Sequence, residues 1–174
     1  MSDTSEFSRM VDRRSLTAEP MVLEADDAER AALAKRFEIV AVESLKATLS
    51  LEADGEQVRA SGQLEADIVQ SCAVSGEDLS VQVREDLSLL FVPESSLAEA
   101  APDEEIELAE EELDEIPYSG TAFDLGEAVA QSLALAIDPY AVGPQADEAR
   151  QRHGLLEEGA AGPLAEALKG LKKD

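Results

Sequence analysis

The sequence predicts an α+β fold in which an antiparallel β meander, or a partly closed barrel, packs against a few helices. Apolar and polar residues alternate through the middle of the chain, which is the period of a half-buried strand. On either side, apolar residues recur four positions apart, as on one face of a helix. A chain of 174 residues suits one domain with tails, because domains cluster at ~100 to 150 residues. We expect a single α+β domain at residues 1–142 and a polar tail at 143–174.

The first elements are predicted near the N-terminus. Phe7 to Val11 can form a short strand. Further on, Asp26 stands three residues before Glu29, a spacing that lets both side chains cap the start of a helix. The alanines that follow favour helix where packing does not decide. The pattern predicts a helix from about Asp27 to Phe37.

Strands are predicted over most of residues 43–91. The first runs to Ala53 and turns at Asp54-Gly55, because a tight primed turn needs positive φ, which Gly adopts freely and Asp tolerates. The second carries Gly62, which predicts a bulge or a close approach of another backbone. In the third, Glu85 breaks the alternation, so we expect an irregularity there. The strands form a meander with one buried and one wet face.

The last predicted elements lie in the C-terminal third. Asp124 can cap a helix, and Glu127 stands at the position that completes a capping box. Pro139 stops this helix. Its apolar stripe consists of Leu125, Val129, Leu133 and Ile137. The tail carries a short amphipathic helix that either docks back on the domain or folds on a partner, so its leucines are candidate partner-binding residues. They are Leu164, Leu168 and Leu171.

Charge is unevenly distributed along the chain. The net charge is −25, and residues 85–149 hold 18 acidic side chains and no lysine, arginine or histidine. We expect a disordered or loosely held acidic loop at about 94–116, where apolar periodicity is almost absent. This loop is either a solubilising insertion without a partner or an attractant for a basic protein surface. In the second case, the candidate partner-binding residues are Glu110, Glu111 and Glu112.

The same charge excludes several partners and compartments. Binding to phosphate backbones and anionic lipids depends on Lys and Arg, so we expect no strong direct nucleic-acid binding and no membrane contact. No apolar run approaches the ~20 residues of a membrane span, and Met1 to Pro20 lacks the apolar centre of a signal peptide. We therefore expect a cytoplasmic protein.

Few residues suggest catalysis. The single histidine, His153, lies in the polar tail, far in sequence from the single cysteine, Cys72, so a Cys–His nucleophile pair is not predicted. No nucleophile elbow, phosphate loop or dinucleotide fingerprint occurs. We predict no enzyme activity, no cofactor and no metal site. Two alternatives stay open: a metal-dependent hydrolase that uses acidic residues, and an acidic mimic of nucleic acid.

The order of segments from Cys72 onward carries a resemblance. A strand ends in Ser71-Cys-Ala-Val-Ser-Gly76, a second strand runs into Val92-Pro93 before the acidic segment, and the capped helix at 123–139 follows. Over roughly residues 70 to 171, this order resembles the YceD family of large ribosomal RNA subunit accumulation proteins. The closing Gly162-Pro-Leu-Ala-Glu-Ala-Leu-Lys-Gly-Leu171 is similar to the tail of its alphaproteobacterial members. The matching structural positions are Cys72, Gly76, Asp124, Leu125, Leu133 and Pro139.

The resemblance implies a non-enzymatic factor that supports 23S ribosomal RNA accumulation in large-subunit biogenesis. Many members carry Cys-x-x-Cys where this chain has Cys72 and Ser75, so a metal-binding role of such members does not carry over. The chain offers no more than a local basic patch such as Arg13-Arg14. We therefore expect it to bind a basic ribosomal protein or a large-subunit maturation factor and to affect the RNA indirectly.

Overall fold

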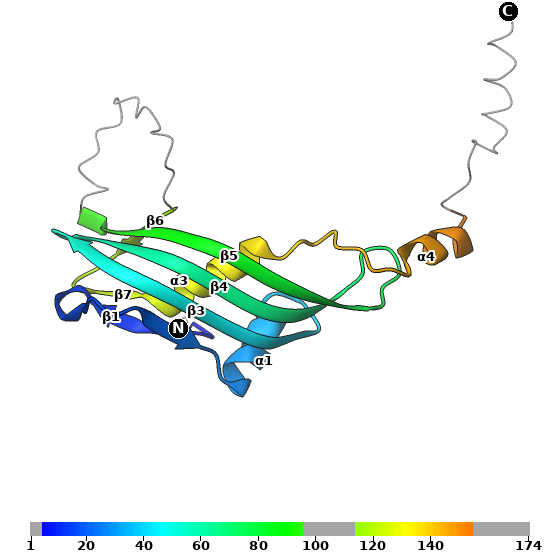
Figure 1. The fold of residues 1–174 in the computed structure, drawn as a ribbon, viewed down its shortest axis with the longest axis horizontal. Coiled ribbons are helices and arrows are strands. Elements are labelled where there is room, and N and C mark those ends of the chain that lie inside the picture. Colours follow the sequence, from blue (N-terminus) through cyan, green and yellow to red (C-terminus); the bar gives the residue numbers. More distant parts are fainter. Residues whose placement is uncertain (1–4, 96–113, 155–174) are drawn as a thin grey trace, which may run out of the picture. The chain divides into compact units, whose positions relative to one another are not determined.

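A computed structural model describes residues 5–95 and 114–154 (Figure 1). By their internal contacts, the residues group into a main unit, Met1–Gln70 with Ser80–Asp138, and a turn unit, Ser71–Leu79 with Pro139–Asp174. The elements in chain order are β1 (Met10–Asp12), the 3-10 helix η1 (Arg13–Ser15), β2 (Met21–Glu24), α1 (Asp27–Arg36), β3 (Ala41–Asp54), β4 (Gln57–Ser71), β5 (Asp78–Pro93), β6 (Asp114–Tyr118), β7 (Ala122–Asp124), α3 (Leu125–Ala136) and α4 (Ala146–Arg152).

A five-stranded sheet in the order β2-β3-β4-β5-β6 is the centre of the fold. Its first strands pair antiparallel, and β6 pairs parallel to β5. The sheet is open, since β2 and β6 lie at its two ends. This confirms the predicted α+β class and the meander, and it decides against a closed barrel. A separate two-stranded sheet joins β1 to β7.

Helix α1 begins as the sequence predicts. The Asp26 side chain accepts from the Glu29 amide at 2.8 Å, and the Glu29 carboxylate accepts from the Asp26 amide at 2.9 Å, which completes a capping box. Leu33 is fully buried, and the helix packs on β3. The helix ends at Arg36 with Phe37 as its C-cap, and Glu38 follows with a left-handed φ of 55°. The predicted range, about Asp27 to Phe37, is confirmed.

The hairpin between β3 and β4 turns one residue later than predicted. Asp54 is the last residue of β3 and pairs with Gln57, so the central turn residues are Gly55 and Glu56. Among the non-glycine residues described, Glu38 alone has a positive φ, so Gly55, at 62°, supplies the positive φ of this turn. A positive φ at the first central position fits a type II′ turn. Asp54 therefore needs no left-handed conformation.

Gly62 marks a close approach of two backbones. It lies opposite Leu49, and a Cβ atom there would fall 1.9 Å from the Thr48 carbonyl oxygen. Of the two alternatives that the sequence left open, the close approach is therefore the correct one. The irregularity of this ladder lies elsewhere, between Val42 and Ser44.

The strand β5 continues through Glu85, whose side chain is exposed although it belongs to the inward-facing phase. Near the end of this strand, Leu89 pairs with Asp114 and Pro93 with Tyr118 of β6. The first three residues of β6 thus lie within the range predicted for the acidic loop, because a short acidic strand with a proline gives no alternation signal. Glu94 and Ser95 at the start of that range are described and exposed, whereas residues 96–113 and the leucines of the tail lie outside the described residues.

The core of the main unit lies between the sheet and α3, which runs behind the sheet in Figure 1. Phe91 of β5 stacks on Phe123 with ring centroids 4.2 Å apart. The segment before β1 also packs here, because Phe7 is fully buried and its carbonyl oxygen would lie 2.6 Å from a Cβ atom on Gly126. The predicted first strand at Phe7 to Val11 starts too early, since Met10 is the first residue that pairs with β7.

Among the residues whose placement is described, no helix combines the length and the apolar composition needed to cross a bilayer.

Candidate functional site

Asp124 holds the start of α3 and the N-terminal segment together. Its Oδ1 atom accepts from the Glu127 amide at 3.1 Å and from the Arg9 amide at 2.8 Å, and its Oδ2 atom accepts from the Ser8 hydroxyl. The predicted N-cap is confirmed. The predicted capping box is only half formed, because the Glu127 carboxylate accepts from Arg36 of α1 instead. The role of Asp124 in the fold is thus structural.

Glu127 and Arg36 form a bidentate charge pair that joins α3 to α1. The Arg36 guanidinium donates to Glu127 Oε1 at 2.7 Å and also reaches Glu6 at 3.0 Å. Hydrogen bonding to Arg36 lowers the pKa of the Glu127 carboxyl from 4.5 to about 2. The Arg9 guanidinium similarly lowers the pKa of Glu29 in α1. These carboxylates are occupied with holding α1, α3 and the N-terminal segment together.

Leu125 and Leu133 are core residues. Both are fully buried within the main unit, and their shared helix face packs with Phe7, Phe91 and Phe123 in one apolar cluster. Burial of a leucine side chain contributes about 1.5–3 kcal/mol. A partner cannot touch these side chains without unfolding the helix, so their match to the family pattern reflects packing.

The turn unit is built around Cys72 and Gly76. The Cys72 amide donates to the Glu77 carbonyl at 2.8 Å, and the Gly76 amide donates to the Cys72 carbonyl at 2.9 Å. Gly76 has a φ of 72°, which an L side chain rarely adopts. The segment that follows Pro139 is hydrogen-bonded to this turn, because the Ala73 amide donates to the Ala141 carbonyl. Two sequence-predicted positions, Cys72 and Gly76, therefore shape one turn.

Backbone donors surround the Cys72 sulfur. The Gly143 amide lies 3.3 Å from Sγ and the Ser75 amide lies 3.4 Å from it. Both hydrogen bonds favour the thiolate. The bond from the Gly143 amide is the largest of the causes that lower the pKa of Cys72 from 9.0 to about 6. The side chain is 4% exposed, so large reagents have little access to it. The arrangement stabilises an anionic sulfur in the turn.

This turn does not fit a metal ion. A tetrahedral structural site wants several Cys or His ligands, and Ser75 stands where a second cysteine would be. Within the described ranges, no group of three His, Cys, Asp or Glu side chains converges as metal ligands. His153 caps the end of α4 through its amide and is exposed. The residues of this turn therefore give no support for carrying a metal-binding role over to this chain.

Pro139 begins the second segment of the turn unit. Helix α3 ends at Ala136, three residues earlier, which agrees with the predicted stop. Just before the proline, the Asp138 carbonyl accepts from Gln70 Nε2 at 2.7 Å. Gln70 is buried, and its Oε1 atom has no hydrogen-bond partner among the described residues.

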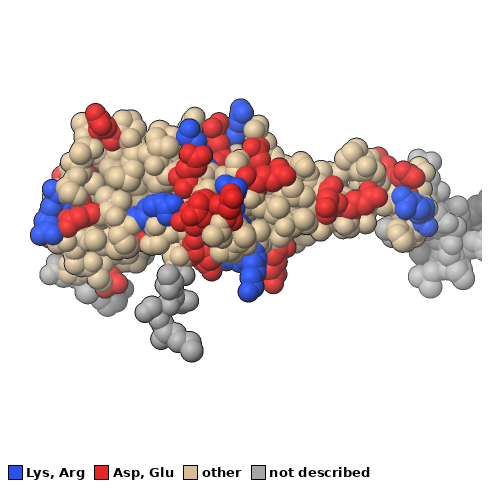
Figure 2. Space-filling model, turned by 90° about the horizontal axis from the view of Figure 1, so that it is seen from below, with Lys and Arg blue, Asp and Glu red and all other residues tan. Residues whose placement is uncertain are grey.

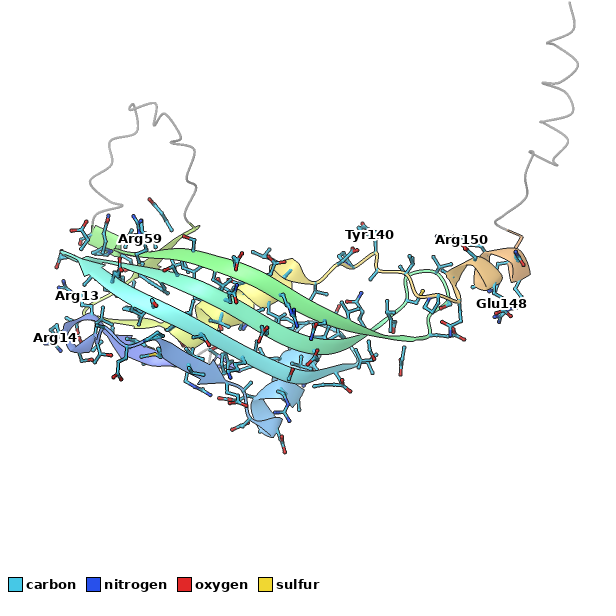
Figure 3. The ribbon with its side chains drawn as sticks, viewed as in Figure 1. Arg13, Arg14, Arg59, Tyr140, Glu148 and Arg150 are labelled. Carbon is cyan, nitrogen blue, oxygen red and sulfur yellow. The ribbon has the colours of Figure 1, made fainter. Side chains whose placement is uncertain are left out.

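The local basic patch is neutralised within the chain. Figure 3 shows Arg13, Arg14 and Arg59 at the same end of the sheet. Arg14 pairs with Asp12 at 2.7 Å, and Arg13 pairs with Glu56 at 2.9 Å. On the face shown in Figure 2, most Lys and Arg side chains lie next to Asp or Glu side chains. Of these three arginines, Arg59 is exposed and has no ion pair among the described residues, so one positive charge at this end stays available to a phosphate backbone.

A groove between β5 and α3 was not predicted from the sequence. We call it the edge groove, and it measures about 230 Å³. Leu135 of α3 stands beside it and is 84% exposed. Two features of the sequence indicate this groove. Glu85 breaks the alternation of its strand, and Leu135 lies off the apolar stripe of its helix. The residues that line it are Glu85, Asp86, Leu87, Ser88, Leu89, Ser132, Leu135 and Ala136.

The chain belongs to the YceD family, described as large ribosomal RNA subunit accumulation proteins, whose model matches residues 60–170. The match extends from β4 through the turn unit, α3 and α4 into the C-terminal segment. No curated protein and no solved structure matches the chain. The family description concerns the accumulation of a ribosomal RNA and names no enzymatic reaction.

Proposed function

We propose that this protein is a non-enzymatic, cytoplasmic factor in large-subunit biogenesis that supports accumulation of 23S ribosomal RNA by binding a basic protein partner. Membership of the YceD family is the observation that carries the proposal. The partner is a basic ribosomal protein or a large-subunit maturation factor. Contact with the RNA itself is indirect.

Charge supports a protein partner over bare RNA. The net charge is −25, and residues 85–149 contain no basic side chain. Nucleic-acid affinity is built on lysine and arginine contacts to phosphates, each of which releases counterions. The arginines near the β3–β4 turn, Arg13 and Arg14, are already paired with carboxylates. A basic protein surface, by contrast, is attracted over distances of about a Debye length.

The cellular test is depletion of the protein followed by quantification of ribosomal RNAs. The proposal expects loss of 23S relative to 16S ribosomal RNA and co-sedimentation of the protein with large-subunit precursors. Re-expression of the full chain should restore the ratio. Unchanged 23S levels together with absence from every precursor fraction would refute the proposal.

The partner class is tested by affinity capture from extract with and without nuclease. A basic protein partner should be retained after nuclease treatment and released as salt rises, because screening weakens the attraction. Capture of naked 23S fragments by the purified protein, resistant to moderate salt, is the contrary result. That outcome would replace the protein partner with direct RNA binding.

A further inference from the structure

The outer edge of β5 is paired along only part of its length. The strand β6 pairs with Leu89–Pro93, and the strand order puts no other described strand beside the preceding stretch, residues 80–88. Figure 1 shows β5 at the upper edge of the sheet, with β6 beside its C-terminal end. Unpaired backbone N–H and C=O groups on such an edge form a template for another strand. That this edge accepts a strand is already shown by β6.

The edge groove lies beside this unpaired stretch. Its apolar residues come from both elements: Leu87 and Leu89 from β5, and Leu135 and Ala136 from α3. Successive side chains of an added strand point to opposite faces of the sheet, so every second one would face the groove. The 84% exposure of Leu135 leaves apolar surface for such a side chain to cover. The place therefore offers main-chain pairing together with an apolar contact.

The acidic side chains on the unpaired edge of β5 determine which kind of strand can bind there. Glu85 lines the groove and is exposed, and no ion pair joins it to a cation among the described residues. Asp86 also lines it and accepts from Gln63 of β4, and within the described part of the chain no ion pair joins it to a lysine or arginine. Like charges directly opposite each other in a sheet are destabilising, while opposite charges stabilise it. A second copy of this acidic chain is thereby disfavoured, and a segment with lysine or arginine is favoured.

We propose that the unpaired edge of β5 at residues 80–88 binds an extended basic segment of a partner protein as an added strand. On the side of the added strand that faces the groove, a basic side chain lies beside Glu85 and the following apolar side chains lie against Leu87 and Leu135. This inference rests on the proposed function, in which the partner is a basic protein, and it names where that partner docks. The charged edge gives selectivity as well as attraction.

The binding mode is tested with the full chain and a synthetic peptide probe that carries one lysine and then two valines at every second position, with threonine between them, so that all three face the groove. Amide hydrogen exchange should slow at alternate positions within residues 80–88 when the probe is added. The opposite edge of the sheet, Met21–Glu24, serves as the internal control and should not change. A peptide with proline replacing its central valine should bind about tenfold more weakly, because proline cannot donate to the ladder and breaks the pairing.

Two pairs of variants separate docking from general attraction. Glu85→Lys should lower the affinity for the probe about five- to tenfold. Glu52→Lys makes the same charge change at an exposed site on β3 and should lower that affinity less than twofold. Leu135→Ala should lower the affinity for the probe about threefold. Val22→Ala, which alters an exposed apolar residue of β2, should leave that affinity unchanged. Equal losses within a pair would overturn the proposal.

Other results also decide the matter. Protection of residues 80–88 without any probe, or a dimer that excludes the probe, would assign the edge to the chain itself or to a second copy and overturn the proposal. In cells, Glu85→Lys should reduce co-sedimentation with large-subunit precursors. If this variant co-sediments like the wild type and sustains 23S levels, the docking site is wrong while the proposed function stands. If the wild type itself fails to co-sediment and its depletion leaves 23S levels unchanged, the proposed function fails, and probe binding still tests the edge.

Discussion

The Arg36 guanidinium at the end of α1 lies 2.7 Å from the Glu127 carboxylate in the first turn of α3. The two side chains are 30% and 25% exposed, so water screens the pair only in part. The pair joins segments that are 91 residues apart in sequence. It therefore fixes the position of the helix that covers the sheet relative to the helix beside β3.

Replacement Glu127→Gln should lower the free energy of unfolding by about 1 kcal/mol at neutral pH, because a partly exposed ion pair with good geometry contributes on that order. The pKa of Glu127 is lowered from 4.5 to about 2 in the folded state, so its stabilisation is complete above the unfolded value. It is lost as the pH falls through about 2. Urea unfolding of both proteins from pH 7 downward measures this difference.

The matched control is Glu65→Gln, which removes a more exposed carboxylate 3.6 Å from Arg84. It should change the free energy of unfolding by no more than about 0.5 kcal/mol at any pH. A constant difference between Glu127→Gln and the wild type across the acid range would show that the charge of Glu127 is not what stabilises the fold.

Gly62→Ala should destabilise the main unit by about 3 kcal/mol or more, because the added Cβ would lie 1.9 Å from the Thr48 carbonyl oxygen and backbone must move. Gly143→Ala is the control, since its nearest contact would be 3.5 Å away, at a Leu79 side chain, and its effect should stay within about 1 kcal/mol. Thermal or urea unfolding compares the two. Equal stability of both variants would contradict the close backbone approach.

Leu133 and Leu135 are neighbouring leucines of α3 with opposite environments. Leu133→Ala should cost about 2–5 kcal/mol, because this side chain is fully buried in the core. Leu135→Ala should stay within about 0.5 kcal/mol, because the side chain is 84% exposed. Urea unfolding distinguishes them. A large loss in the second variant would mean that Leu135 is covered within the folded chain, against the edge groove.

Cys72 should titrate near pH 6 in the folded protein, because the Gly143 and Ser75 amides stabilise its thiolate. Its ultraviolet thiolate absorbance should show this midpoint, and denaturant should return the pKa to its ordinary value of 9.0. A depressed folded pKa stabilises the fold above the unfolded value and ceases to do so as pH falls through about 6. The stability advantage over Cys72→Ala should therefore grow from pH 6 towards pH 9. An unshifted midpoint would contradict these hydrogen bonds.

Local signals in the sequence were sufficient for much of the fold. The capping box of α1, the stripe of α3 and the alternation of β3 to β5 each depend on residues within a few positions of one another. Glu127 shows the limit of such reasoning, since its spacing from Asp124 suggested a capping box and its true partner is distant in sequence. The pairing of β1 with β7 is also long-range, and both strands are too short to show a period.

The candidate site was less predictable. Cys72 and Gly76 were found through the order of family segments, and the structure places both in one turn. An open strand edge has no sequence signature, because it depends on which strands fail to become neighbours. Glu85 gave the clearest sequence signal of the edge groove, because it is a charged residue at a position where the alternation predicts an apolar one. Interpreting that signal required the position of α3 beside the strand.

The parallel direction of β6 has a consequence for the acidic segment between it and β5. Because Leu89 pairs with Asp114 and Pro93 with Tyr118, the chain leaving Pro93 must travel back about 13 Å before it can begin β6. A tight turn cannot make this connection. The strand geometry thus requires a connection that spans this distance, and it sets no requirement on the charge of residues 96–113. Replacing the acidic side chains of residues 96–113 by uncharged ones at equal length would test partner attraction separately from the connection, with Glu94 kept because it accepts from the Ser119 hydroxyl.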